Sequence, residues 1–266
     1  MGPWVCGSVG PHMNLPTNRF KAAIAARTPQ IGLWSQAGHG IVTEILADAK
    51  PDWVLIDTEH APLDLAVVTD QLRIIQPSAS SAIVRPAWND AVLFKRILDA
   101  GAQTLLVPYV ESAEEAHRAV MAARYPPSGR RGVATTHRAN RYGRVGDYYA
   151  RATDETCVLV QLETTQAVAA LEEIADVDGV DGVFIGPSDL AASMGHVGQP
   201  THPEPRKLIL DACTRAKAVG VPIGILAPVE ADAQMFLETG FTFVAVGSEI
   251  GLLRKATDDL RAKFKN

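Results

Sequence analysis

Polar side chains with catalytic potential stand at the ends of short apolar runs in this sequence. His60 lies just past one run, Arg85 ends another, Glu163 closes a third, and Asp189 follows a fourth. A carboxylate that ends an apolar run, as Glu163 does, is costly to desolvate unless a cation compensates its charge. Oxygen ligands of this kind suit Mg²⁺ or Mn²⁺. With Arg85 as a donor fork for a developing enolate and His60 as a base that titrates near neutrality, the set predicts a site that enolises a small 2-oxo acid.

Other interpretations of single residues stay open. Asp189 is also explained as an acid in the first turn of a helix, where negative charge is favoured. Asp57 and Glu59 flank His60 and are candidates for supporting it. Trp34 ends the first apolar run, so it either walls a substrate pocket or packs in the core. Each signal is weak alone, and the prediction therefore depends on their combination.

The positions of the lysines argue against a covalent mechanism. A Schiff-base aldolase needs a lysine inside the barrel, beside the substrate carbonyl. Every lysine of this chain falls in a predicted helix, in the C-terminal tail, or ahead of a strand. They are Lys21, Lys50, Lys95, Lys207, Lys217, Lys255, Lys263 and Lys265. We therefore expect activation of the carbonyl by a divalent metal, with Mg²⁺, Mn²⁺ or Co²⁺ as candidates, Zn²⁺ as a further one, and no organic cofactor.

Eight short apolar runs alternate with segments of helical spacing, and together they form the scaffold that must position these groups. The runs are rich in Val, Ile and Leu and do not alternate apolar with polar residues, as expected of parallel strands buried on both faces. They span residues 31–34, 53–57, 82–86, 104–108, 157–163, 182–187, 222–226 and 243–247. We expect an α/β fold, a (β/α)8 TIM barrel, with an extra N-terminal helix and a C-terminal helix that packs on a neighbouring subunit. A doubly wound open sheet is the alternative, but the sequence lacks the glycine-rich loop that usually follows its first strand.

Two further features punctuate this pattern. Gly101, Gly220 and Gly240 close helical segments, where a left-handed backbone conformation costs little. Residues 124–156 form a long, arginine-rich and mostly irregular connection. Loops of this length are usually functional or interfacial, and a solvated surface insertion is an equal alternative.

The composition of the 266-residue chain indicates one domain with an ordinary core. Its formal charge of -5 argues against nucleic acid or an anionic membrane as a partner, and no apolar stretch approaches the roughly 20 residues that span a bilayer. Three cysteines without metal-ligand spacing are consistent with a reducing, cytoplasmic location. Residues 1–12 lack periodicity and are interpreted as an added, disordered tail. Residues 13–266 are then a single TIM-barrel domain.

Several motifs, in their order along the chain, resemble the HpcH/HpaI family of class II pyruvate aldolases. They include LIDTEHAPLD, AIVRP, LVQLET and GVFIGPSDLAASMG, and the match runs from about residue 31 to residue 247. The resemblance implies that Glu163 and Asp189 bind the divalent metal, that Arg85 stabilises the enolate, and that His60 accepts the proton. It also implies a substrate pocket lined by Trp34, Gln161, Gly186, Pro187 and the backbone of Ser188 and Asp189.

The family pattern further assigns Asp99 the task of raising the basicity of His60. Asp99 ends the helix after the third strand, so it should lie at the opposite end of its own barrel from His60. It can serve a histidine only across a subunit contact, unless it is merely a solvated acid near a helix end. We therefore expect a homo-oligomer, a hexamer as the resemblance suggests.

Taken together, the residues and the resemblance predict a metal-dependent aldolase with small-molecule substrates. It would cleave or form 4-hydroxy-2-oxo acids through the enolate of pyruvate or hydroxypyruvate and an aldehyde. One alternative is a CoA-thioester lyase of the citramalyl or malyl type, although no adenine or phosphate grip is visible in the sequence. Another is a non-catalytic barrel that binds a 2-oxo acid.

Overall fold

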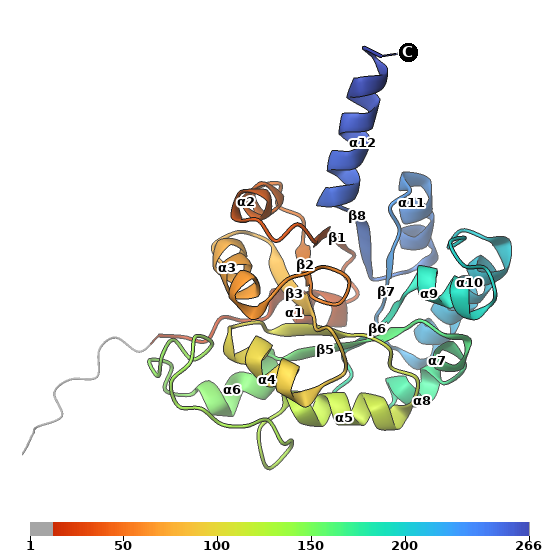
Figure 1. The fold of residues 1–266 in the computed structure, drawn as a ribbon. Coiled ribbons are helices and arrows are strands. Elements are labelled where there is room, and N and C mark those ends of the chain that lie inside the picture. Colours follow the sequence, from red (N-terminus) through yellow and green to blue (C-terminus); the bar gives the residue numbers. More distant parts are fainter. Residues whose placement is uncertain (1–12, 266) are drawn as a thin grey trace, which may run out of the picture.

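The strands of the chain close into a single parallel barrel. The computed structural model describes residues 13–265, so the interpretation of residues 1–12 lies outside the described residues. The eight strands are hydrogen-bonded in sequence order, with β1 closing against β8 (Figure 1). Their bounds are β1 Gln30–Ser35, β2 Trp53–Asp57, β3 Ser81–Arg85, β4 Thr104–Val107, β5 Cys157–Leu162, β6 Gly182–Ile185, β7 Ile223–Leu226 and β8 Phe243–Ser248. The prediction of a TIM barrel is confirmed, and the open sheet is excluded.

Helices surround this barrel and follow the strands in turn (Figure 1). They are α2 Gly40–Asp48, α3 Leu65–Ile75, α4 Ala91–Asp99, α5 Ala113–Ala123, α6 Tyr148–Glu155, α7 Thr165–Ala169, α8 Leu171–Ala175, α9 Pro187–Ser193, α10 Pro203–Val219 and α11 Glu230–Thr239. The helix ends follow local sequence rules. Asp64, Asp90 and Ser112 cap α3, α4 and α5 through side-chain oxygens, as N-cap residues do. Gly220 and Gly240 adopt the expected left-handed conformation, with φ of 76° and 112°.

Successive residues of each strand face two different cores. In β2, Leu55 packs inside the barrel, whereas Val54 and Ile56 pack against the outer helices. The extra N-terminal helix, α1 Arg19–Ala25, closes the amino end of the barrel. Its Phe20 makes edge-to-face contacts with Trp53 and Phe243, with ring centroids 6.0 and 5.5 Å apart. The barrel interior is therefore a packed core, and the only strand ends left for chemistry are the carboxyl ends.

The long connection of residues 124–156 is less irregular than expected. Its last part forms α6, whose Tyr148 packs edge-to-face on Tyr125 at 6.3 Å. Arg131 is almost completely buried beside this pair and lies over the Tyr125 ring at 4.5 Å. Helix α6 was not predicted from the sequence, because this eight-residue helix has no long apolar stripe. Aromatic contacts hold it in place instead.

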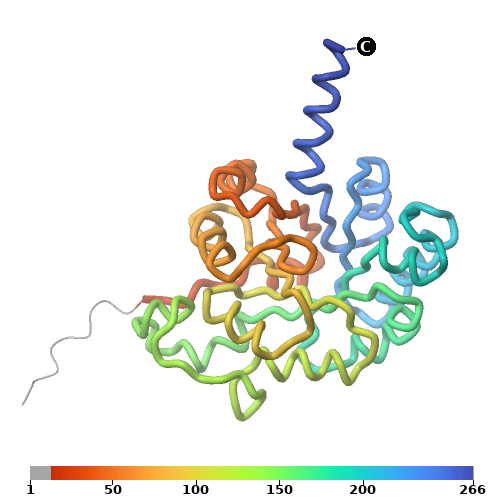
Figure 2. Tube along the Cα trace, viewed as in Figure 1, coloured from red at the N-terminus to blue at the C-terminus, as the bar shows by residue number. Residues whose placement is uncertain are grey.

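The last helix, α12 Glu249–Ala262, leaves the barrel and extends away from it, as Figures 1 and 2 show. It contacts β1 and β8 at its start, and every residue from 252 to 265 is exposed. Leu253 and Phe264 are 66% and 81% exposed. The projecting helix therefore carries an exposed apolar surface. Within residues 13–265, no helix is both long and apolar enough to cross a membrane.

Candidate active site

A cavity of about 400 Å³ opens at the carboxyl ends of the strands. Most of the side chains singled out in the sequence line it, although they come from five separate strands or the loops after them. The lining residues that were expected are Trp34, His60, Arg85, Gln161, Gly186, Pro187, Ser188 and Asp189. We call this space the mouth cavity. No lysine is among the described residues that line it.

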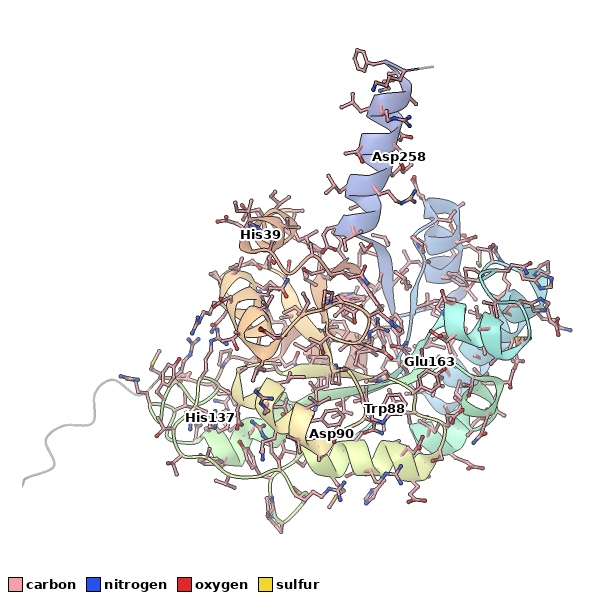
Figure 3. All side chains as sticks on the ribbon, viewed as in Figure 1. His39, Trp88, Asp90, His137, Glu163 and Asp258 are labelled. Carbon is pink, nitrogen blue, oxygen red and sulfur yellow. The ribbon has the colours of Figure 1, made fainter. Side chains whose placement is uncertain are left out.

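Glu163 follows the end of β5 (Figure 3). It is not among the residues that line the cavity, but it contacts the lining residues Gln161 and Gly186. Its side chain is buried, with 1% of the residue exposed. Oε1 accepts a hydrogen bond from the backbone N–H of Tyr109 at 2.8 Å, and Oε2 accepts one from Gln161 Nε2 at 2.6 Å. Burial, with smaller contributions from the nearby acids Glu59 and Asp189, raises the pKa of Glu163 to about 7 despite these two hydrogen bonds. A group of carboxylates this close in a desolvated site calls for a cation.

The structure also explains how the Glu163 carboxylate can occupy this position. Gly186 follows β6 and lies so close that a Cβ atom there would be 2.7 Å from Glu163 Oε2. Pro187 then begins α9, with the fixed φ that suits a first helical position. Asp189 falls in the first turn of that helix, so helix electrostatics favour it there as well as any role in the cavity.

Arg85 is held by two acids, one at the end of the neighbouring strand β2 and one in the loop after it. Its Nε and Nη2 donate to the two oxygens of Asp57, each at 2.9 Å, because Asp57 and Arg85 are partners in the β2–β3 register. Its Nη1 lies 2.7 Å from Glu59 Oε2, and its guanidinium lies over the Trp34 ring at 4.3 Å.

The pKa values of the two acids shift in opposite directions, although Arg85 acts to lower both. Burial works to raise the pKa of Asp57, but the hydrogen bonds and charge of Arg85 outweigh it, so the pKa is lowered. Burial raises the pKa of Glu59 despite the charge of Arg85. The contacts with both acids fix the orientation of the guanidinium. Its remaining N–H groups are available to an oxygen in the cavity.

The side chain of His60 is largely exposed to solvent, at 61%. Its Nε2 is 3.9 Å from Glu59 Oε2, and its backbone N–H points at Asp57 Oδ1 at 3.4 Å. The ring thus has an acidic neighbour and access to the cavity, and it has no tight partner among the described residues.

Asp99 is not brought to His60 within one chain. It ends α4 at the amino end of the barrel, where its Oδ1 accepts a hydrogen bond from Arg131 Nη2 at 2.6 Å. This placement matches the expectation from topology. Whether Asp99 acts across a subunit contact stays a prediction, and its ion pair with Arg131 supports a structural role as well.

Two contributors to the site were missed in the sequence. Gln36 lines the mouth cavity and donates from Nε2 to Asp57 Oδ2 at 3.1 Å. It follows β1, so the rule applied to other strand ends would have found it. Tyr109 supplies its backbone N–H to Glu163 from a left-handed conformation, with φ of 52°. Nothing in the sequence signals that conformation, because it is rare for residues other than glycine.

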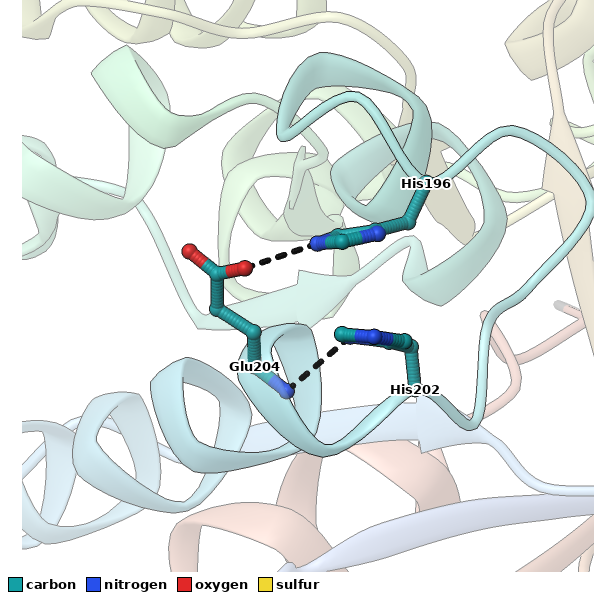
Figure 4. A group of neighbouring side chains, drawn as sticks. All are labelled: His196, His202 and Glu204. Carbon is teal, nitrogen blue, oxygen red and sulfur yellow. Dashed lines mark hydrogen bonds and ion pairs between the residues drawn. The ribbon is translucent and has the colours of Figure 1, made fainter.

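A second group of potential ligands lies elsewhere, between α9 and α10 (Figure 4). Ligand atoms of His196, His202 and Glu204 lie within 4.8 Å of one another. The two rings stack in parallel with centroids 3.7 Å apart, so their nitrogen lone pairs point side by side and do not converge. His196 Nε2 also lies 2.7 Å from Glu204 Oε2. These contacts join the loop after α9 to the start of α10, and none of the three residues lines the mouth cavity.

Fold and site together define a (β/α)8-barrel enzyme whose mouth combines buried acids with a fixed arginine. The chain belongs to the HpcH/HpaI aldolase/citrate lyase family, whose model matches residues 30–256. It is 51% identical over 248 residues to a 5-keto-4-deoxy-D-glucarate aldolase of Citrobacter koseri, covering 93% of this chain and 96% of that one. A 5-keto-4-deoxy-D-glucarate aldolase of Escherichia coli O6:H1 is 50% identical, with 93% and 97% covered.

Solved structures agree with this assignment. A HpcH/HpaI aldolase/citrate lyase family protein from Burkholderia cenocepacia J2315 superposes with a TM-score of 0.91 at 37% identity, covering 94% of this chain and all of that one. The family predicted from the motifs is confirmed. The chain is accordingly an enzyme of the carbon–carbon lyase class. This excludes the alternative of a non-catalytic barrel that binds a 2-oxo acid.

Proposed function

We propose that this enzyme is a metal-assisted aldolase that cleaves a 4-hydroxy-2-oxo diacid of the 5-keto-4-deoxy-D-glucarate type to pyruvate and an aldehyde. The observation that supports it most is the buried carboxylate of Glu163, which adjoins a cavity lined by Asp189 and Arg85. The names of the two most similar relatives reported above point to the same substrate.

The chemistry of that compound fits the site. Its keto group at C5 and carboxylate at C6 form a 2-oxo acid, C4 is a methylene, and C3 carries a hydroxyl. Breaking the bond between C3 and C4 yields pyruvate as its enolate and a three-carbon hydroxy acid with an aldehyde. The reaction therefore needs a base at the C3 hydroxyl and positive charge at the keto oxygen and the carboxylate.

The donor set fits a hard divalent cation. Glu163 and Asp189 would hold it, since both offer oxygen and leave several positions for water and substrate. Burial is the main reason the pKa of Glu163 is high, and the negative charge of the neighbouring Glu59 adds to it. A bound Mg²⁺, Mn²⁺ or Co²⁺ would polarise the keto group of the substrate, and oxygen ligands alone do not select among these ions.

The protein's own side chains would perform the remaining steps. His60 accepts the C3 hydroxyl proton as the bond to C4 breaks, and it or a water returns a proton to C4 to form the methyl group. Arg85 donates to the enolate oxygen, with its direction fixed by Asp57. Gln161 orients Glu163, and the unused backbone N–H groups of Ser188 and Asp189 at the start of α9 receive the substrate carboxylate.

Proton exchange tests this proposal without the aldehyde. Pyruvate methyl protons are followed by NMR in D₂O with metal-stripped protein, and again after Mn²⁺ or Mg²⁺ is added. Exchange that requires both metal and His60 supports the proposal, and His60→Asn is the matched variant. Folded, metal-loaded protein that exchanges no pyruvate proton contradicts it. Hydroxypyruvate and a citramalyl-type thioester are then the next donors to examine.

The assembly belongs to the same proposal. The exposed apolar side of α12 is covered by a second copy of the chain, and Asp99 reaches His60 of a neighbouring subunit in a hexamer. Exposure of Leu253 and Phe264 and the separation of Asp99 from the mouth cavity support an oligomer.

A further inference from the structure

Glu249 is a buried carboxylate that the proposed chemistry does not use. It begins α12 and is only 8% exposed. Its Oε1 accepts hydrogen bonds from two consecutive backbone N–H groups, those of Gln36 at 2.5 Å and Ala37 at 2.6 Å. Its Oε2 is buried and has no hydrogen-bond partner among residues 13–265. Two adjacent N–H groups that converge on one anion form a small binding site for it, so Glu249 anchors the loop after β1.

Gln36 extends this anchor into the mouth cavity. Its side chain lines the cavity and donates to Asp57 Oδ2 at 3.1 Å. The same carboxylate accepts hydrogen bonds from Nε and Nη2 of Arg85, at 2.9 Å each. Three short polar contacts therefore join Glu249 to Arg85, and Asp57 and Arg85 are both almost fully buried. Buried charges in such a chain have few alternative partners, so displacing one displaces the next.

We propose that Glu249 is a positioning residue for Arg85, and that it makes the geometry of the mouth cavity depend on where α12 is held. The inference rests on the proposed function only in giving Arg85 a role at the enolate. Among residues 13–265, no other side chain of this helix hydrogen-bonds to the barrel. From residue 252 to residue 265 it is exposed, and its most extensive contacts with the strands are with β1 and β8. Seating α12 on a second copy therefore also seats Gln36, Asp57 and Arg85.

The charge of Glu249 is expected to matter as well as its size. Hydrogen bonds to a carboxylate are roughly twice as strong as those to a neutral carbonyl. Glu249→Gln keeps an acceptor of the same reach and should preserve part of the anchor, whereas Glu249→Ala removes it. Asp258→Asn is the matched control, because Asp258 lies on the same helix and makes an exposed ion pair with Arg254 (Figure 3).

Hydrogen–deuterium exchange of the full, metal-loaded enzyme gives a readout that does not depend on turnover. Glu249→Ala is expected to speed exchange of the Gln36 and Ala37 amides by about tenfold, as loss of a hydrogen bond to a charged group implies. A smaller increase should reach the amides of Glu59 and His60, which point at Asp57 Oδ1 at 3.1 and 3.4 Å. In the same variant kcat should fall while the metal dissociation constant stays within twofold. Glu249→Gln should restore part of the slow amide exchange and part of kcat.

Each result decides the matter. Faster exchange confined to residues 36 and 37, with kcat unchanged, would overturn the positioning role and leave a local loop anchor. If Glu249→Ala does not fold, the Gln variant carries the same comparison. If the wild-type enzyme exchanges no pyruvate proton, the proposed function is wrong. The positioning role is nevertheless supported if deuterium uptake in the Glu249 variants also increases at residues 59 and 60.

The dependence on α12 has its own variant. Leu253→Asp changes a side chain that is 66% exposed and leaves Glu249 in place. We expect it to weaken assembly in light scattering and to speed exchange at residues 36 and 37. Lost assembly with wild-type exchange at these residues would show that the mouth cavity does not respond to the seating of the helix. Fully retained assembly with faster exchange would lead to the same conclusion, because exchange would then change while the seating does not.

Discussion

The backbone of Gly186 lies against the carboxylate of Glu163. A Cβ atom at position 186 would be 2.7 Å from Glu163 Oε2 and 2.8 Å from Glu163 Cβ, too close for any side chain. We expect Gly186→Ala to displace the carboxylate and to weaken Mn²⁺ binding by about 10- to 100-fold, as other disturbances around metal ligands do. Calorimetric titration measures the affinity. Gly247→Ala is the control, since its Cβ would meet only Leu33, at 4.0 Å. Equal affinity of the two variants would contradict a ligand role for Glu163.

Arg85 is predicted to tolerate no substitution, including the one that keeps its charge. Lysine cannot make the two parallel bonds to Asp57, so Asp57 would keep a buried charge with poorer compensation. We expect Arg85→Lys to lower kcat by about 10²- to 10³-fold, the usual cost of one donor to a developing oxyanion. Pyruvate proton exchange and steady-state cleavage should fall together. A variant that loses only substrate affinity would show that Arg85 binds the ground state and does not stabilise the enolate.

The pKa of Glu163 predicts opposite pH dependences for stability and for metal binding. Burial raises this pKa from 4.5 to about 7 in the metal-free protein. The folded chain therefore holds a proton that the unfolded chain releases above pH 4.5. The contribution of Glu163 to stability is complete below that pH and is lost as the pH rises through about 7, at a cost of about 3 kcal/mol.

Urea unfolding of the metal-free protein checks the first half of this prediction. Between about pH 5 and about pH 8, wild type should lose stability relative to Glu163→Gln, which cannot ionise. Metal affinity should move the other way and rise with pH through about 7, because the ligand must be deprotonated. Parallel stability curves for the two proteins would refute the raised pKa.

Much of the scaffold was predictable because the buried parallel strands have an unmistakable composition. The run at 53–57 coincides with β2, and 82–86 is one residue from β3. The placement of Glu163 followed from the same reasoning, since an acid that ends an apolar run has to lie at the barrel mouth. Asp57 could also have been predicted as the partner of Arg85, because the two residues end neighbouring strands in the same register.

What escaped the sequence depends on contacts between distant segments. The N–H of Tyr109 reaches Glu163 only because a non-glycine residue adopts a positive φ, and such strain is decided by packing and not by residue type. The anchor of Glu249 on Gln36 joins residues 213 positions apart in the chain.

The separation of Asp99 from the mouth cavity yields a test of assembly that needs no structure of the oligomer. His60→Asn and Asp99→Asn are each expected to have low activity alone. If each site takes His60 from one subunit and Asp99 from another, mixing and reassembling the two variants restores about one quarter of the sites, by random pairing in a symmetric oligomer. Recovered pyruvate exchange measures that fraction, and the same variants mixed without dissociation serve as control. No recovery after verified subunit exchange would place Asp99 with Arg131 as a structural ion pair and end its assignment to the catalytic histidine.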